Sequence, residues 1–179
     1  MSDIGRAPIC TSKARSVAPG ASGPAASFAL GQTNLTNSAT AAPSATSLYR
    51  PRAVITVGTK LIVADAGNNR VLIWNTIPTT TGDAADVVLG QANLTSGAPN
   101  RGVPITNTSA AANYLFTPTG LATDGTKLIV ADTNNNRVLI WNTVPTVNGT
   151  SADVVVGQST FTGRTPNFGA TIRDNSLAL

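Results

Sequence analysis

Short apolar runs alternate along the chain with turns rich in Thr, Asn, Gly and Pro. The clearest run, Leu61–Ala64, is apolar without alternation, as in a strand buried on both faces. A polar turn, Asp65–Asn69, separates it from a second run, Val71–Trp74, and its Asn and Gly residues tolerate positive φ. Long helical periodicity is missing from the sequence. The pattern therefore predicts an all-β protein.

The same pattern recurs 67 residues later. Gly58–Thr76 returns as Gly125–Thr143, with only the two residues after the Asp changed. A partial copy lies upstream, where Leu30-Gly-Gln32 matches Leu89-Gly-Gln91 at a spacing of 59. Changes of length between repeats fall in loops, so the first linker is eight residues shorter than the second. Repeats of this size indicate one structural unit per copy.

Each repeat predicts four strands. In the first repeat they are Arg52–Val57, Lys60–Ala64, Arg70–Asn75 and Asp86–Gly90, and in the second the outermost two are Thr119–Thr123 and Asp153–Gly157. Four antiparallel strands with apolar inner members are typical of a β-propeller blade between two neighbours. A β-solenoid is the competing architecture, but its repeats are usually much shorter. Upstream, Phe28–Gln32 has the identity of a fourth strand without the other three.

The predicted fold is an all-β propeller fragment, with two four-stranded antiparallel blades plus one orphan N-terminal strand. The expected segments are 1–26, disordered; 27–50, orphan outer strand and linker; 51–91, the first blade; 92–117, linker; 118–158, the second blade; and 159–179, linker to a missing third blade. The pattern Leu-x-x-Pro precedes each blade, and Leu177 begins the same pattern at the end of the sequence. We therefore expect further blades of the same propeller as partners.

Charge and composition exclude several kinds of chemistry. The net charge is +4 and the pI about 9.8, but the positive residues are scattered, which does not favour nucleic-acid binding. One cysteine, Cys10, cannot form a disulfide within the chain. Without histidine, Ser-His-Asp and Cys-His catalysis and His-ligated zinc are excluded for this chain. We predict no catalytic residue, no metal and no cofactor.

Two aspartates are the strongest candidates for chemistry. Asp65 and Asp132 end the second strand of each repeat, beside Asn-rich turns that suggest calcium. An EF-hand-type loop needs alternating ligands and a late Glu, which neither turn supplies. The structural interpretation is favoured: each Asp caps backbone N–H groups of the turn and pairs with Arg70 or Arg137 on the returning strand.

Two tryptophans occupy equivalent positions at the end of the third strand. Trp74 and Trp141 would stack on a sugar or a base if they were exposed. More often, such an indole fills the space between blades while its N–H finds an acceptor. Packing between blades is therefore the preferred interpretation.

These motifs resemble a known family. Pro118–Asp132, followed by Asn135–Val138 and a closing Gly157, resembles the NHL repeat, and the resemblance covers roughly residues 27–179. The histidine common in the NHL turn is replaced by Asn69 and Asn136. The resemblance implies a propeller of six or a similar number of blades. The long linkers resemble a bacterial subgroup found in large secreted or surface proteins.

The predicted function is a non-catalytic interaction scaffold that presents the linkers, residues 32–47, 91–113 and 158–175, to a protein or glycan. One alternative is a propeller lyase with its active site in the missing blades, since the resemblance implies histidine and metal at the central pore of such enzymes. The other is RNA binding through a basic circle formed by Lys60, Lys127, Arg70 and Arg137.

The compartment is left open. The sequence has no signal peptide and no apolar run long enough to cross a membrane, which as written predicts a cytoplasmic chain. The family resemblance instead implies a secreted or cell-surface protein.

Overall fold

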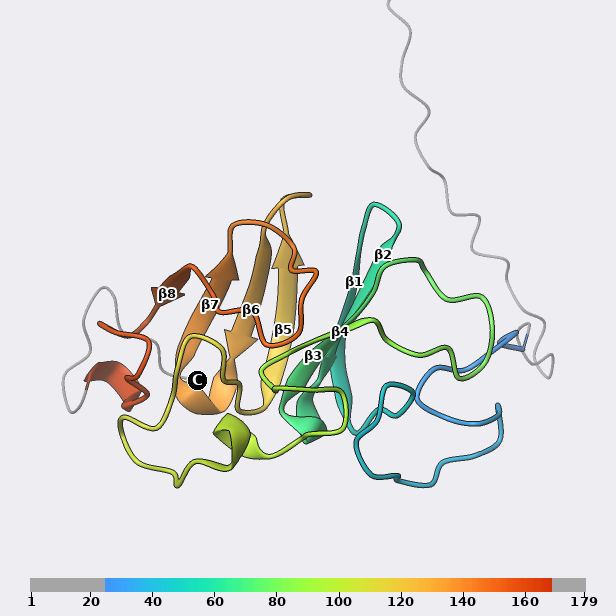
Figure 1. Cartoon of the computed structure of the whole chain (residues 1–179), viewed down its shortest axis with the longest axis horizontal. Coiled ribbons are helices and arrows are strands. Elements are labelled where there is room, and N and C mark those ends of the chain that lie inside the picture. The colour runs from blue at the N-terminus through green and yellow to red at the C-terminus, as the bar shows by residue number, and fades with distance from the viewer. Residues whose placement is uncertain (1–24, 169–179) are drawn as a thin grey trace, which may run out of the picture.

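The computed structural model describes residues 25–168 and confirms the predicted fold class. Two four-stranded antiparallel sheets stand side by side as neighbouring blades (Figure 1), and helical structure in this part of the chain is limited to 3-10 turns. The two sheets do not close into a ring. The segment expected to be disordered lies almost entirely outside the described residues, as does the end of the last linker.

Both blades follow the order of the chain. Blade 1 consists of β1 (Pro51–Val57), β2 (Lys60–Asp65), β3 (Arg70–Trp74) and β4 (Val87–Leu89). Blade 2 consists of β5 (Pro118–Thr123), β6 (Leu128–Asp132), β7 (Arg137–Trp141) and β8 (Val154–Val156). The observed strands agree with the predicted ones to within one or two residues. Because the strand sequences repeat, the register repeats as well: Asp65 faces Arg70, and Asp132 faces Arg137.

A short turn joins the second and third strands of each blade. It is a single 3-10 turn, η1 (Ala66–Asn68) in blade 1 and η3 (Thr133–Asn135) in blade 2. The residue that follows has a left-handed backbone, with φ of 53° at Asn69 and 51° at Asn136. Asn is one of the few residues besides Gly that adopts this conformation readily, which explains its repetition at this position.

The main apolar core lies between the blades. We call the side of a blade that faces the next blade along the chain its forward face, and the opposite side its rear face. The forward face of blade 1 presents Ile62, Val71, Ile73, Val87 and Leu89. The rear face of blade 2 presents Leu128, Val130, Leu139, Trp141 and Ala152. These residues form one buried cluster, so the two blades share a core instead of each having its own.

The prediction that residues 28–32 form an orphan strand is wrong. Residues 28–32 form no ladder, and their only β-type contact among the described residues is an isolated bridge between Gly31 and Ser47. In blade 1 the matching segment is a strand because it pairs with β3. No equivalent of β3 precedes residue 28 in the described part of the chain, so the segment has no strand with which to pair. We call residues 28–32 the strap.

Candidate functional site

Each blade contains one buried ion pair at the end of its second strand. The Arg70 Nε donates to Asp65 Oδ2 at 2.7 Å, and the Arg137 Nε donates to Asp132 Oδ2 at the same distance. All four side chains are completely buried. The facing register on adjacent strands brings each pair together, as the sequence interpretation expected.

The aspartates hold the incoming linker more than the turn. Asp65 Oδ1 accepts the backbone N–H of Tyr49 at 2.7 Å, and Asp132 Oδ1 accepts that of Phe116 at 2.7 Å. Neither carboxylate caps the backbone N–H groups of its 3-10 turn, contrary to the sequence interpretation. Instead, its second oxygen accepts the side-chain amide of the turn residue Asn68 or Asn135. Each carboxylate thus bonds to the linker, to its Arg and to a turn side chain, and to no backbone N–H of the turn.

The arginines complete this arrangement by donating to backbone carbonyls of both flanking linkers. For Arg70 the acceptors are Ser44 and Ser47 before the blade and Leu94 after it. For Arg137 they are Ala111 and Tyr114 before the blade and Phe161 after it. Burial raises the pKa of the Asp132 carboxyl, against the opposing effect of the Arg137 charge and of its hydrogen bonds. The pairs thus use their hydrogen-bonding capacity on the chain itself and offer little to a ligand.

The tryptophans lie inside the protein. Trp74 is 3% exposed and Trp141 is 1% exposed. Each indole N–H donates at 3.1 Å to a backbone carbonyl of the following loop, that of Asp83 or Thr150. Buried rings with satisfied N–H groups leave no platform for a sugar or a base.

Residues 25–168 contain no cluster of side chains of the kind that binds a metal ion. Nowhere in this range do three or more His, Cys, Asp or Glu side chains gather. The turn that suggested calcium, after Asp132, contributes one carboxylate, and Arg137 already pairs with it. The neighbouring amide of Asn135 is likewise engaged, with Asn100 and Asp132.

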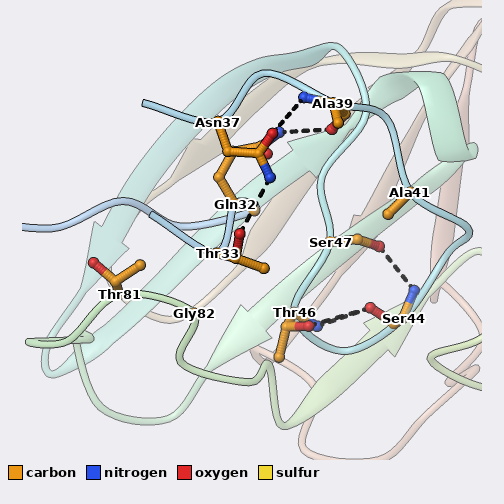
Figure 2. Close-up of a pocket in the computed structure, with 11 residues that line it drawn as sticks. Gln32, Thr33, Asn37, Ala39, Ala41, Ser44, Thr46, Ser47, Thr81 and Gly82 are labelled. Atoms are coloured by element: carbon orange, nitrogen blue, oxygen red, sulfur yellow. Dashed lines mark hydrogen bonds between the residues drawn. The ribbon is translucent and has the colours of Figure 1, made fainter. Parts of the chain in front are cut away.

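A polar pocket of about 370 Å³ lies between the strap, the first linker and the loop around Thr81 (Figure 2). Several of its polar groups bond to one another. The Gln32 amide donates to the Ala39 carbonyl, and the Asn37 amide donates to Thr33 Oγ1. None of the described residues that line the pocket is aromatic. Its polar groups therefore shape the linker, and it is a weak candidate for a ligand site.

Charge is separated between the two ends of the blades. We call the end at which β2 and β6 finish the Asp end, and the end with the β1–β2 and β5–β6 turns the turn end. The exposed arginines Arg50 and Arg52 lie at the Asp end, beside the start of β1. The turn end holds Lys60 and Lys127 together with four carboxylates that are not buried, Asp83, Asp86, Asp124 and Asp153.

This arrangement corrects the basic circle proposed from the sequence. Lys60 and Lys127 lie at the opposite end of the blades from Arg70 and Arg137, and the two arginines are buried. The four side chains therefore form no common surface. At the Asp end, the exposed charges of Arg50 and Arg52 are not shared by the repeat, since Arg52 corresponds to Thr119 and Arg50 to Thr117.

A second pocket, of about 250 Å³, opens among these arginines at the Asp end. Its lining residues come from the starts of both blades and from the β2–β3 turn of blade 1: Tyr49, Arg50, Arg52, Ala66, Gly67, Asn69, Phe116 and Thr117. Among the described residues, none of the ion pairs involves Arg50 or Arg52. Sequence reasoning missed this site because no motif marks it. It depends on which linker ends meet in space.

No protein-family model and no curated protein sequence matches this chain. Within residues 25–168, the structure has no helix with the length and apolar character needed to span a membrane.

Proposed function

We propose that this chain is a non-catalytic interaction scaffold of the NHL type, and that its Asp end binds an acidic segment of a protein partner. The observation that supports the proposal is the separation of charge between the two ends. At the Asp end, Asp65 and Asp132 are neutralised by buried arginines, while Arg50 and Arg52 are exposed. At the turn end, carboxylates outnumber lysines. An acidic segment is therefore attracted to one end and repelled from the other.

The chemistry of the pocket suits carboxylates. Arg50 and Arg52 contribute planar guanidinium groups, which bind carboxylate oxygens in pairs of parallel hydrogen bonds. Asn69 and Thr117 line the same pocket and add neutral polar groups. Arg164 lies at the same end of blade 2, where its guanidinium donates to Asn135 Oδ1 and to the Asn134 carbonyl. It extends the positive surface beyond the pocket.

Nucleic acid fits this end less well. Single-stranded binders usually stack bases on free aromatic rings. Here the Arg50 guanidinium lies 5.2 Å from the centre of the Tyr49 ring, and the Arg164 guanidinium lies 5.6 Å from that of Phe116. The rings already stack with arginines of the chain itself. No observation favours the lyase alternative.

The test is a binding titration with a fluorescein-labelled oligoglutamate peptide, followed by fluorescence anisotropy at low salt. We expect the double variant Arg50→Ser/Arg52→Ser to bind about tenfold more weakly than the unmodified chain. The matched control, Lys60→Ser/Lys127→Ser, removes the same charge from the turn end and should change affinity less than about twofold.

Three outcomes would contradict the proposal. Equal losses in the two double variants would show that net charge, not the Asp end, attracts the peptide. Tighter binding of a labelled oligouridylate of equal charge would favour RNA. Tighter binding of a neutral glycan than of the peptide would favour the glycan alternative.

A further inference from the structure

The contact between the two blades is a complete interface within one chain. The forward face of blade 1 packs on the rear face of blade 2, and Leu121 from the inner strand β5 joins this cluster. Loop contacts support it at the outer edge, where the Val88 carbonyl of β4 accepts the N–H of Gly149 at 2.8 Å and the Val88 N–H donates to Asn148 Oδ1.

Because the repeat is 67 residues long, the chain carries the same two faces again at its outer sides. The forward face of blade 2 presents Ile129, Val138, Ile140, Val154 and Val156, the counterparts of the forward face of blade 1. Here the valines of β8 are uncovered, with Val154 41% and Val156 43% exposed. Their counterparts Val87 and Leu89 are buried to 3% and 0% exposure.

The rear face of blade 1 is open only beside its inner strand, since Val63, Leu72, Trp74 and Ala85 are buried. It presents Leu61, Val63, Leu72, Trp74 and Ala85, the counterparts of the rear face of blade 2. Beside its inner strand lies a groove of about 350 Å³, lined by Leu30, Leu48, Pro51, Arg52, Ala53, Val54, Leu61 and Val63. Val54 is 62% exposed, although its counterpart Leu121 is packed against blade 1.

The strap covers only the outer part of this rear face, and it makes the contacts there that β4 makes with blade 2. The Ala29 carbonyl accepts the N–H of Gly82 at 3.1 Å, as Val88 accepts that of Gly149. A Cβ at Gly31 would lie 2.7 Å from Leu48, and a Cβ at Gly90 would lie 2.7 Å from Leu115. The strap therefore occupies the place that the outer strand of a preceding blade would take.

The linkers contain a matching polar pair. In the chain, Asn100 and Asn135 exchange two side-chain hydrogen bonds, of 3.0 and 2.8 Å, across the junction between the blades. The shorter first linker supplies no such counterpart for Asn68 among the described residues. Asn167, the counterpart of Asn100, has the same left-handed backbone, with φ of 51° against 46°. If a second copy packed on blade 1 as blade 1 packs on blade 2, its Asn167 would lie beside Asn68, as Asn100 lies beside Asn135.

We propose that a second copy of this chain docks head to tail, with the forward face of its blade 2 on the rear face of blade 1 of the first copy. The strap of the first copy leaves this rear face when the second copy binds. The contact between the two blades within the chain indicates that a second copy covers this face, because each copy carries both complementary faces at opposite sides. Such a contact is heterologous, so each copy uses one of its two faces and the dimer retains one free face of each kind.

Sedimentation velocity over a concentration series up to about 0.5 mM tests the proposal, because mass action makes such association concentration-dependent. We expect Val54→Asp to block the rear face and Val154→Asp to block the forward face, so that each variant alone is monomeric. An equimolar mixture of the two should form a 1:1 dimer, since each variant supplies the face that the other lacks. Val147→Asp, at a site 66% exposed and outside both faces, should associate as the unmodified chain does.

A second variant addresses the strap. Gly31→Ala should dislodge it, because the added Cβ meets Leu48 and the residue has φ of 81°. We expect this variant to associate at lower concentration than the unmodified chain, by about fivefold or more. The proposal is overturned if the mixture of the two blocked variants stays monomeric, or if both the unmodified chain and Gly31→Ala stay monomeric throughout.

Discussion

Blade 1 and blade 2 have the same central strand, Arg-Val-Leu-Ile-Trp, but they differ in how it is covered. Every residue of β3 is buried, whereas β7 alternates between buried and half-buried positions. The strap, the linkers and blade 2 cover β3 on both sides, while among residues 25–168 no blade packs against the forward face of blade 2. Burial in this fold is therefore set by the neighbours of a strand more than by its own residues.

The largest expected effect concerns the buried Asp–Arg pair that both blades contain. Asp65→Asn and Asp132→Asn each leave a buried guanidinium without its carboxylate, and we expect each to lower the free energy of unfolding by about 3–5 kcal/mol. Both pairs are completely buried, so the two losses should be similar, in contrast to the difference between the blade faces. Urea denaturation of the two variants measures this. A loss below about 1 kcal/mol in either blade would show that its linkers are held by other contacts.

The difference between the blades appears directly in a matched pair of core substitutions. Ile73→Ala removes a completely buried side chain between the blades, and we expect it to cost about 2–4 kcal/mol. Ile140→Ala makes the same change on the half-buried forward face of blade 2 and should cost about 1 kcal/mol or less. Equal costs in urea denaturation would contradict the interpretation that a neighbouring blade, and not the strand itself, supplies the burial.

The smallest effect concerns the turns between the first two strands of each blade, where blade 2 has a carboxylate that blade 1 lacks. Asp124 of blade 2 accepts the backbone N–H groups of Lys127 and Thr126, which lower its pKa to about 2, and blade 1 has Val57 at the same position. The folded pKa lies below the unfolded value of 3.8, so the stabilisation is present above pH 3.8 and is lost as the pH falls through about 2.

Carboxyl NMR titration checks this directly. The expected titration midpoint of the Asp124 carboxyl is at about pH 2. The variant Asp124→Asn should remove the pH dependence of the β5–β6 turn signals. A midpoint at the ordinary value for an aspartate would show that the turn does not hold the carboxylate.

Strand positions and the facing Asp–Arg pairs were predictable, because the apolar runs and the turn residues repeat at one constant spacing. The carbonyl acceptors of Arg70 were not, since Ser44, Ser47 and Leu94 contribute backbone atoms that carry no residue-type signal. The strap was predicted as a strand because its sequence matches β4. Pairing, which decides whether a segment becomes a strand, depends on a partner that sequence similarity does not reveal.

The arginine of each blade also bears on how fast the chain folds. Arg70 joins carbonyls 26 and 23 residues upstream and 24 residues downstream, and Arg137 repeats the same three separations. Each guanidinium thus closes a chain loop on either side of its blade, and the entropy of closure must be spent before the contacts form. Folding should be slow at these two steps and fast within each hairpin. Because the loops are equal in length, the two blades should cross this barrier at similar rates despite their different surroundings.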